Sequence, residues 1–127
     1  MSANVQNILI VDKIKSIRRA IALYLELRGY RTLEAEHGRE AMEMMDRHDV
    51  GLILVDLMIS GMDTATLAER IKTTKIGVIF MSSYLPDPES GFGSENDTFP
   101  VLVKPFAGEE LLGEIEKRMP AALPVCS

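Results

Sequence analysis

The sequence predicts an α/β domain in which helices cover both faces of a parallel sheet. Four short apolar runs are continuous rather than alternating, which is typical of strands buried on both sides: residues 8–11, 52–55, 78–81 and 101–103. Segments of helical periodicity alternate with these runs, which indicates βαβ units. A fifth strand is expected at residues 30–34, where mixed polarity suits the edge of a sheet.

Four segments repeat apolar side chains at helical spacing: residues 17–25, 41–48, 67–71 and 111–119. Gly29 is the expected stop of the first helix, and Asp63 is the expected N-cap of the third. The last helix carries acidic residues 109–110 in its first turn and basic residues 117–118 in its last turn, which suits the helix dipole. Residues 83–100 are rich in turn-forming residue types, so no regular helix is expected there.

Length and composition indicate one small acidic domain. We expect the 127 residues to form a single domain over residues 1–120 and a flexible tail at 121–127. The net charge of −5 argues against direct nucleic-acid binding, which normally requires a basic face. The single cysteine, Cys126, rules out an intramolecular disulfide and favours a reducing compartment. The chain has no signal-peptide pattern and no apolar stretch near the roughly 18 residues of a membrane helix, so we expect a cytoplasmic protein without a membrane partner.

Polar side chains follow the inner strands of the predicted sheet. Asp12 and Lys13 follow the first strand, and the later inner strands are followed by Asp56, by Ser82 and Ser83, and by Lys104. Each of them alone has a structural explanation, as a helix cap, a loop residue, a turn residue or a solvated charge. The carboxyl ends of parallel strands meet at one edge of the sheet, where such folds bind ligands. The arrival of all these groups at the same edge therefore predicts a functional site.

This set of side chains suits the chemistry of phosphoryl groups. An aspartate can attack phosphorus and form an acyl phosphate. A second carboxylate helps to hold Mg²⁺, which neutralises phosphoryl oxygens. A lysine supplies a point charge and a serine supplies a hydrogen bond to the same oxygens.

Over about residues 7–119 the chain resembles the receiver domains of two-component response regulators. The motifs that carry the resemblance are ILIVD at 8–12, SIRRAIALYLELRGY at 16–30, LILVDLMISGMD at 52–63, VIFMSSY at 78–84 and VLVKPF at 101–106. The resemblance implies a flavodoxin-like (CheY-like) doubly wound sheet of five strands in the order 2-1-3-4-5. The resemblance also implies that the Lys104–Pro105 peptide is cis. Residues 83–100 occupy the place of the fourth helix of this family, and their turn-forming residue types predict that this helix is short or absent.

The resemblance further implies the roles of the site residues. Asp56 would be the phosphoacceptor, Ser82 the switch hydroxyl and Lys104 the lysine that contacts the phosphoryl group. The expected ligands of Mg²⁺ are Asp12, Asp56 and the backbone carbonyl of Met58. A histidine kinase or phosphotransfer protein would donate the phosphoryl group, and a downstream effector protein or domain would receive the signal. The domain would modify itself at Asp56 and would not be an enzyme acting on other molecules.

Lys13 is the main departure from the family pattern, because receivers usually carry a second metal-binding acid at this position. The usual three carboxylates and one lysine become two of each here, so the electrostatic demand for a divalent cation largely disappears. The Lys13 ammonium lies either beside Asp56 in place of the metal or out in solvent. In both placements a direct metal ligand is missing, so we expect weakened or altered Mg²⁺ dependence. Further departures are Ser60, Thr64 and Val101, where proline, glycine and an aromatic residue are usual.

Several alternatives remain open. Within the receiver interpretation, the domain is either phosphorylated at Asp56 or is a pseudo-receiver that docks partners without phosphate. A flavin-binding electron carrier would need a Ser, Thr or Gly phosphate cradle after the first strand, where this chain has Lys13. A hydrolase of the aspartyl-phosphate type would need further acids after the nucleophile, but Leu57 and Met58 follow Asp56.

Overall fold

The computed structural model describes residues 6–58, 66, 69–70, 72–74, 76–83 and 101–119. The strands and helices within these residues are β1 (Asn7–Val11), α1 (Lys15–Leu27), β2 (Arg31–Ala35), α2 (Gly38–Arg47), β3 (Val50–Asp56), β4 (Gly77–Ser82), β5 (Val101–Val103) and α4 (Gly108–Arg118). The strands form one five-stranded sheet in the order β2-β1-β3-β4-β5, and every neighbouring pair is parallel. Both the predicted fold class and the predicted strand order are therefore confirmed.

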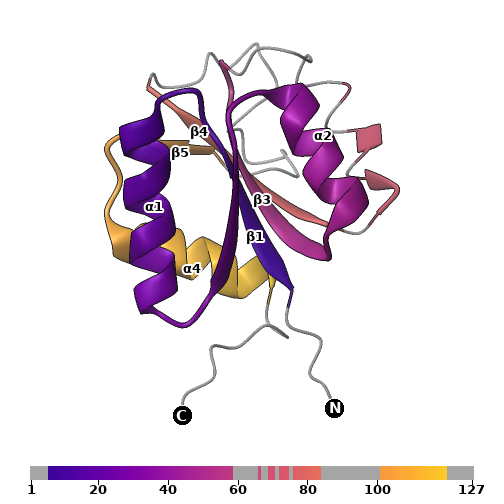
Figure 1. The fold of residues 1–127 in the computed structure, drawn as a ribbon. Coiled ribbons are helices and arrows are strands. Elements are labelled where there is room, and N and C mark those ends of the chain that lie inside the picture. The colour runs from indigo at the N-terminus through magenta and orange to yellow at the C-terminus, as the bar shows by residue number, and fades with distance from the viewer. Residues whose placement is uncertain are drawn as a thin grey trace.

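The helices lie in two layers on opposite faces of the sheet. Figure 1 shows α1 and α4 on one face and α2 on the other. The described ends of the chain, after α4 and before β1, lie at the bottom of this view. The opposite edge of the sheet carries the loops that follow β1, β3 and β5, and these loops position the site.

The predicted strands are all present, with small differences at their ends. β3 extends the predicted run 52–55 in both directions, and β2 begins and ends one residue later than expected. α1 ends before Gly29, whose φ of 94° lies in the left-handed region that glycine tolerates. The acidic first turn and the basic last turn of α4 are as predicted.

Some expectations concern residues outside the described ranges. Residues 66, 69–70 and 72 are helical, in line with the expected third helix. The expected N-cap at Asp63, the departures at Ser60 and Thr64, the segment 84–100 and the tail 121–127 lie outside the described residues.

Two apolar clusters, one on each face of the sheet, form the core. Along β1, Ile8 and Ile10 face the α1 and α4 side, whereas Leu9 and Val11 face the α2 side. All four side chains are fully buried, which explains why the strand is continuously apolar. The helices contribute Ala22, Leu25, Leu111 and Ile115 to the first cluster and Ala41 to the second.

Gly113 provides a test of the packing of α4. A Cβ atom built at Gly113 has nothing within 4 Å, so Gly113→Ala is expected to raise the free energy of unfolding by about 0.5–1 kcal/mol through helix propensity alone. Chemical denaturation followed by circular dichroism measures the change. The matched control is Gly108→Ala, where the new Cβ would overlap the ring of Tyr24 on α1. Equal stabilisation by both substitutions would contradict this packing of α1 against α4.

Candidate functional site

Three charged side chains meet at the carboxyl edge of the sheet. Asp12 directly follows β1, and Asp56 is the last residue of the neighbouring β3. Lys104 follows β5, and its backbone N–H donates to the Ser82 carbonyl at 2.7 Å. The Lys104 ammonium donates to Oδ2 of Asp12 and to Oδ2 of Asp56, both at 2.6 Å. One lysine therefore bridges the two aspartates that the sequence predicts at the ends of separate strands.

Backbone N–H groups hold the other oxygen of each carboxylate. The Ile14 N–H donates to Oδ1 of Asp12 at 2.9 Å, and the Met58 N–H donates to Oδ1 of Asp56 at 2.7 Å. In both cases the donor is two residues after the aspartate, the arrangement of an Asx turn. These turns orient both carboxylates with Oδ2 towards the lysine.

Burial strengthens the electrostatics of this group. The Asp12 side chain is fully buried, and only 12% of Lys104 and 15% of Asp56 are exposed. Burial alone would lower the pKa of Lys104, but the hydrogen bonds to Asp12 and Asp56 and their charges outweigh it, so the pKa is raised above 10.5. Lys104 therefore contributes stability that is complete below pH 10.5 and is lost as the pH rises through its raised pKa.

An open pocket gives solvent access to the bridged aspartates. Its volume is about 240 Å³, and its lining residues are Asp12, Lys13, Ile14, Asp56, Met58, Ser83 and Lys104. Asp56 is the more exposed of the two carboxylates. A reactant that enters this pocket meets the Asp56 carboxylate with the Lys104 ammonium beside it.

The side chain of Lys13 lies at the exposed rim of the same pocket. It forms no ion pair with any residue that the structure describes, and the ammonium beside Asp56 belongs to Lys104. Of the two placements that the sequence left open, the structure shows the solvent-exposed one. Lys13 thus adds positive charge at the pocket mouth without displacing Lys104.

The two serines that follow the apolar run of β4 have different environments. Ser82 is the last residue of β4 and is buried, with 6% of its surface exposed. Ser83 lines the pocket with the carboxylates. The role of Ser82 as the switch hydroxyl stays a prediction. The sequence predicted Ser83 beside Ser82 at this edge of the sheet, and the structure places Ser83 in the pocket lining.

The peptide between Lys104 and Pro105 is cis, as the resemblance implied. Val101, at the start of β5, is partly buried against the cluster on the α2 side of the sheet. A valine thus occupies the position where the family often carries an aromatic side chain.

Comparison with known protein families identifies the family of this chain. The family model described as the response regulator receiver domain matches residues 8–116. The chain belongs to the response regulator receiver domains. As a receiver domain of the two-component response regulators, it is a signalling module, which removes the flavin-carrier and hydrolase alternatives.

Curated relatives of this receiver domain are longer proteins. The chain is 33% identical over 115 residues to the phosphate regulon transcriptional regulatory protein PhoB of Pseudomonas aeruginosa, and the match covers 87% of this chain and 50% of PhoB. It is 34% identical over 108 residues to the transcriptional regulatory protein SrrA of Staphylococcus aureus, and that match covers 83% of this chain and 44% of SrrA. The receiver chain therefore spans about half the length of these relatives.

Solved structures share the receiver fold. A CheY-like receiver domain protein from Methanospirillum hungatei superposes with a TM-score of 0.79 at 23% identity, covering 94% of this chain and 97% of that one. The response regulator TrrA of Thermotoga maritima, solved in complex with Mg²⁺-BeF, gives a TM-score of 0.74 at 26% identity, covering 90% and 99%. None of the helices that the structure of this receiver describes has the length and apolar composition needed to cross a bilayer.

The residues of this receiver fit a divalent ion poorly. Among the residues that the structure describes, no three His, Cys, Asp or Glu side chains gather where they could hold a metal ion. The Oδ2 atoms of Asp12 and Asp56 already accept hydrogen bonds from Lys104. Lys13 adds a positively charged side chain to the lining of the same pocket. The two carboxylates of this site thus offer a divalent ion few free oxygen ligands.

One residue next to the site was missed by sequence reasoning. Arg18 lies on α1, and its guanidinium donates to the backbone carbonyl of Asp12 at 2.6 Å. In the sequence Arg18 looks like an ordinary charged residue beside the apolar face of a helix. The only signal was its position one residue after Ile17, at the edge of that face.

Proposed function

We propose that Asp56 accepts a phosphoryl group from a histidine kinase or phosphotransfer protein, with a weakened dependence on Mg²⁺. The observation that carries this proposal is the double ion pair of Lys104 at the base of a pocket that is open at Asp56. The bridge places a permanent positive charge next to the acceptor oxygen. Such preorganised charge stabilises the developing charge of a phosphoryl group during transfer.

The transfer step is a displacement at phosphorus. A carboxylate oxygen of Asp56 forms the new P–O bond while the P–N bond to the donor histidine breaks, and the electron pair of that bond stays with the imidazole. Lys104 holds the carboxylate in place and turns an N–H towards a phosphoryl oxygen as the acyl phosphate forms. Asp12 keeps the other side of the ammonium fixed through its 2.6 Å hydrogen bond.

Weakened metal dependence follows from the charges around Asp56. When bound, Mg²⁺ supplies neutralisation of the phosphoryl oxygens. Here Lys104 neutralises part of the carboxylate charge, and Lys13 adds a second cation at the rim of the pocket. The attraction of the site for a divalent cation is correspondingly smaller.

The signal passes to an effector protein or domain. The relatives PhoB and SrrA are named transcriptional regulatory proteins and are about twice as long as the matched region. We assign this chain only the receiving step, with self-modification at Asp56, and assign the output to a partner. Val101 has no aromatic ring that could change position on phosphorylation, so the signal to the effector depends on other parts of the surface.

A second candidate function is phosphate-independent docking of a partner. The hydrogen bonds of the two carboxylates favour this function, because every carboxylate oxygen of Asp12 and Asp56 already has a donor. In this pseudo-receiver the site would serve as a structural element. The two functions differ in whether Asp56 binds a phosphoryl mimic.

Binding of beryllofluoride, a mimic of the acyl phosphate, separates the two functions. We expect a bound signal in fluorine NMR with the wild-type chain and its loss in Asp56→Asn, because the mimic bonds to the Asp56 carboxylate. The matched control is Asp46→Asn, which removes an exposed carboxylate on α2 that pairs with Arg70. The control should retain the signal. Absence of a bound signal at every Mg²⁺ concentration, with the fold intact, would favour the docking module.

A further inference from the structure

All four polar groups of Asp12 are held by hydrogen bonds. Its N–H donates to the Ala35 carbonyl at 3.1 Å, and its carbonyl accepts from the Arg18 guanidinium at 2.6 Å. Its two carboxylate oxygens accept from the Ile14 N–H and from the Lys104 ammonium. The hydrogen bond from Arg18 differs from the other three, because in it a charged side chain donates to the backbone of the turn.

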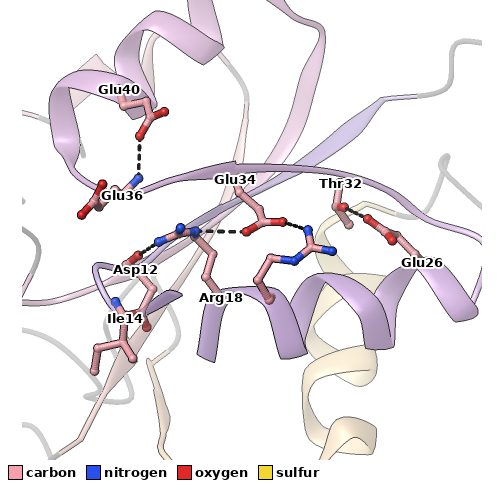
Figure 2. Close-up of polar contacts among 9 residues, drawn as sticks. Asp12, Ile14, Arg18, Glu26, Thr32, Glu34, Glu36 and Glu40 are labelled. Carbon is pink, nitrogen blue, oxygen red and sulfur yellow. Dashed lines mark hydrogen bonds and ion pairs between the residues drawn. The ribbon is translucent and has the colours of Figure 1, made fainter. Parts of the chain in front are cut away.

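Arg18 connects the site to the edge strand of the sheet. Its Nε donates to Oε1 of Glu34 on β2 at 3.0 Å, while a terminal nitrogen donates to the Asp12 carbonyl. Figure 2 shows the guanidinium lying between the two acceptors. Only 12% of the Arg18 side chain is exposed. A planar guanidinium can serve both acceptors at once, whereas a lysine ammonium lacks this forked geometry.

The carbonyl that Arg18 holds belongs to the same turn as the Asp12 carboxylate. β1 ends at Val11, so no strand partner fixes the peptide plane that follows Asp12. The next peptide plane along the chain carries the Ile14 N–H, which donates to Oδ1 of the same carboxylate. If the plane turned, the carboxylate would lose this donor and its alignment with Lys104.

We propose that Arg18 is a positioning residue for phosphoryl transfer at Asp56. Anchored by Glu34, it fixes the turn at Asp12 and thereby the orientation of the Asp12 carboxylate and of the Lys104 ammonium. The transfer part of this inference rests on the proposed function, but the orientation of Lys104 is measurable without phosphorylation. A merely structural role, in which Arg18 only ties α1 to β2, would change stability and leave the ammonium unaffected.

Arg18→Gln tests this role with two measurements. The nitrogen NMR signal of the Lys104 ammonium should shift in the unphosphorylated protein, because the Asp12 partner moves. The rate of Asp56 phosphorylation at saturating phosphoramidate should fall about tenfold, the usual effect of losing a group that orients a site ligand. The phosphoramidate concentration at half-maximal rate should stay the same, since Arg18 does not line the pocket.

Arg19→Gln is the matched control. Arg19 also pairs with Glu34, but it is 54% exposed and does not contact Asp12. Its substitution removes the same charge from the next residue of the same helix and should leave the Lys104 signal and the rate unchanged. Arg18→Lys keeps the charge and one hydrogen bond, so its rate should lie between those of the wild type and Arg18→Gln.

Glu34→Gln provides a second route if Arg18→Gln fails to fold. It should produce the same direction of shift at Lys104, and combining it with Arg18→Gln should add little, because the two residues act through one contact. An unchanged Lys104 signal in both variants would overturn the positioning role. If the wild-type chain is not phosphorylated, the proposed function fails, and the Lys104 signal still decides the role of Arg18.

Discussion

Lys104→Met is expected to lower the free energy of unfolding at neutral pH by about 3 kcal/mol, the lower end for breaking a buried ion pair. The substitution leaves the fully buried Asp12 carboxylate and the largely buried Asp56 carboxylate without their shared cation. Their charges then repel each other at close range in a largely buried site. Urea denaturation followed by far-ultraviolet circular dichroism measures the loss.

The pH dependence distinguishes this cause from a simple packing defect. The ion pairs raise the pKa of Lys104 above 10.5, so its contribution is complete at neutral pH and disappears as the pH rises through the raised value. The stabilities of the wild type and Lys104→Met should therefore converge in strongly alkaline solution. A constant difference across that range would point to packing instead.

Lys117→Met is the matched control for the loss of a lysine. Lys117 lies on α4, is 70% exposed and approaches Glu114 only to 3.9 Å. Exposed pairs of this kind contribute little, so the control should change stability by less than about 0.5 kcal/mol. A large loss in the control would mean that removing any positive charge destabilises this acidic chain.

The fold was predictable from the sequence because its signals are local. Strands covered on both faces must be continuously apolar, and β1 and β3 carry uninterrupted runs whose side chains are buried in both clusters. The stop at Gly29 and the charged ends of α4 were likewise visible in the residues themselves. The strand order came from the family resemblance, since periodicity alone does not determine it.

The site was only partly predictable, because its contacts join residues far apart in the chain. Sequence reasoning brought Asp12, Asp56 and Lys104 to one edge, since parallel strands end together. It could not show that one ammonium bridges both acids, because that contact depends on the paths of three side chains from separate strand ends. The contact of Arg18 with a backbone carbonyl left no pattern in the sequence.

Lys13→Asp is expected to raise the affinity of the site for Mg²⁺ about a hundredfold. The substitution replaces a cation at the pocket rim with an anion, and a charge change of two units beside a divalent ion amounts to about 2–3 kcal/mol even with strong solvent screening. The new carboxylate would also join Asp12 and Asp56 as a third oxygen ligand, which suits the preference of Mg²⁺. Isothermal titration calorimetry of both proteins gives the two dissociation constants.

Lys15→Asp is the control that distinguishes direct ligation of Mg²⁺ from general electrostatic attraction of the ion. Lys15 is the first residue of α1, is exposed, and does not line the pocket, so its substitution makes the same charge change just outside the site. If affinity rises only in Lys13→Asp, the lysine at this position is what weakens the metal site. If both substitutions raise affinity equally, only the net charge near the pocket matters, and the explanation based on a missing ligand is wrong. If neither substitution raises it, the bridge from Lys104 to both aspartates is strong enough to exclude the ion, which would favour the phosphate-independent function.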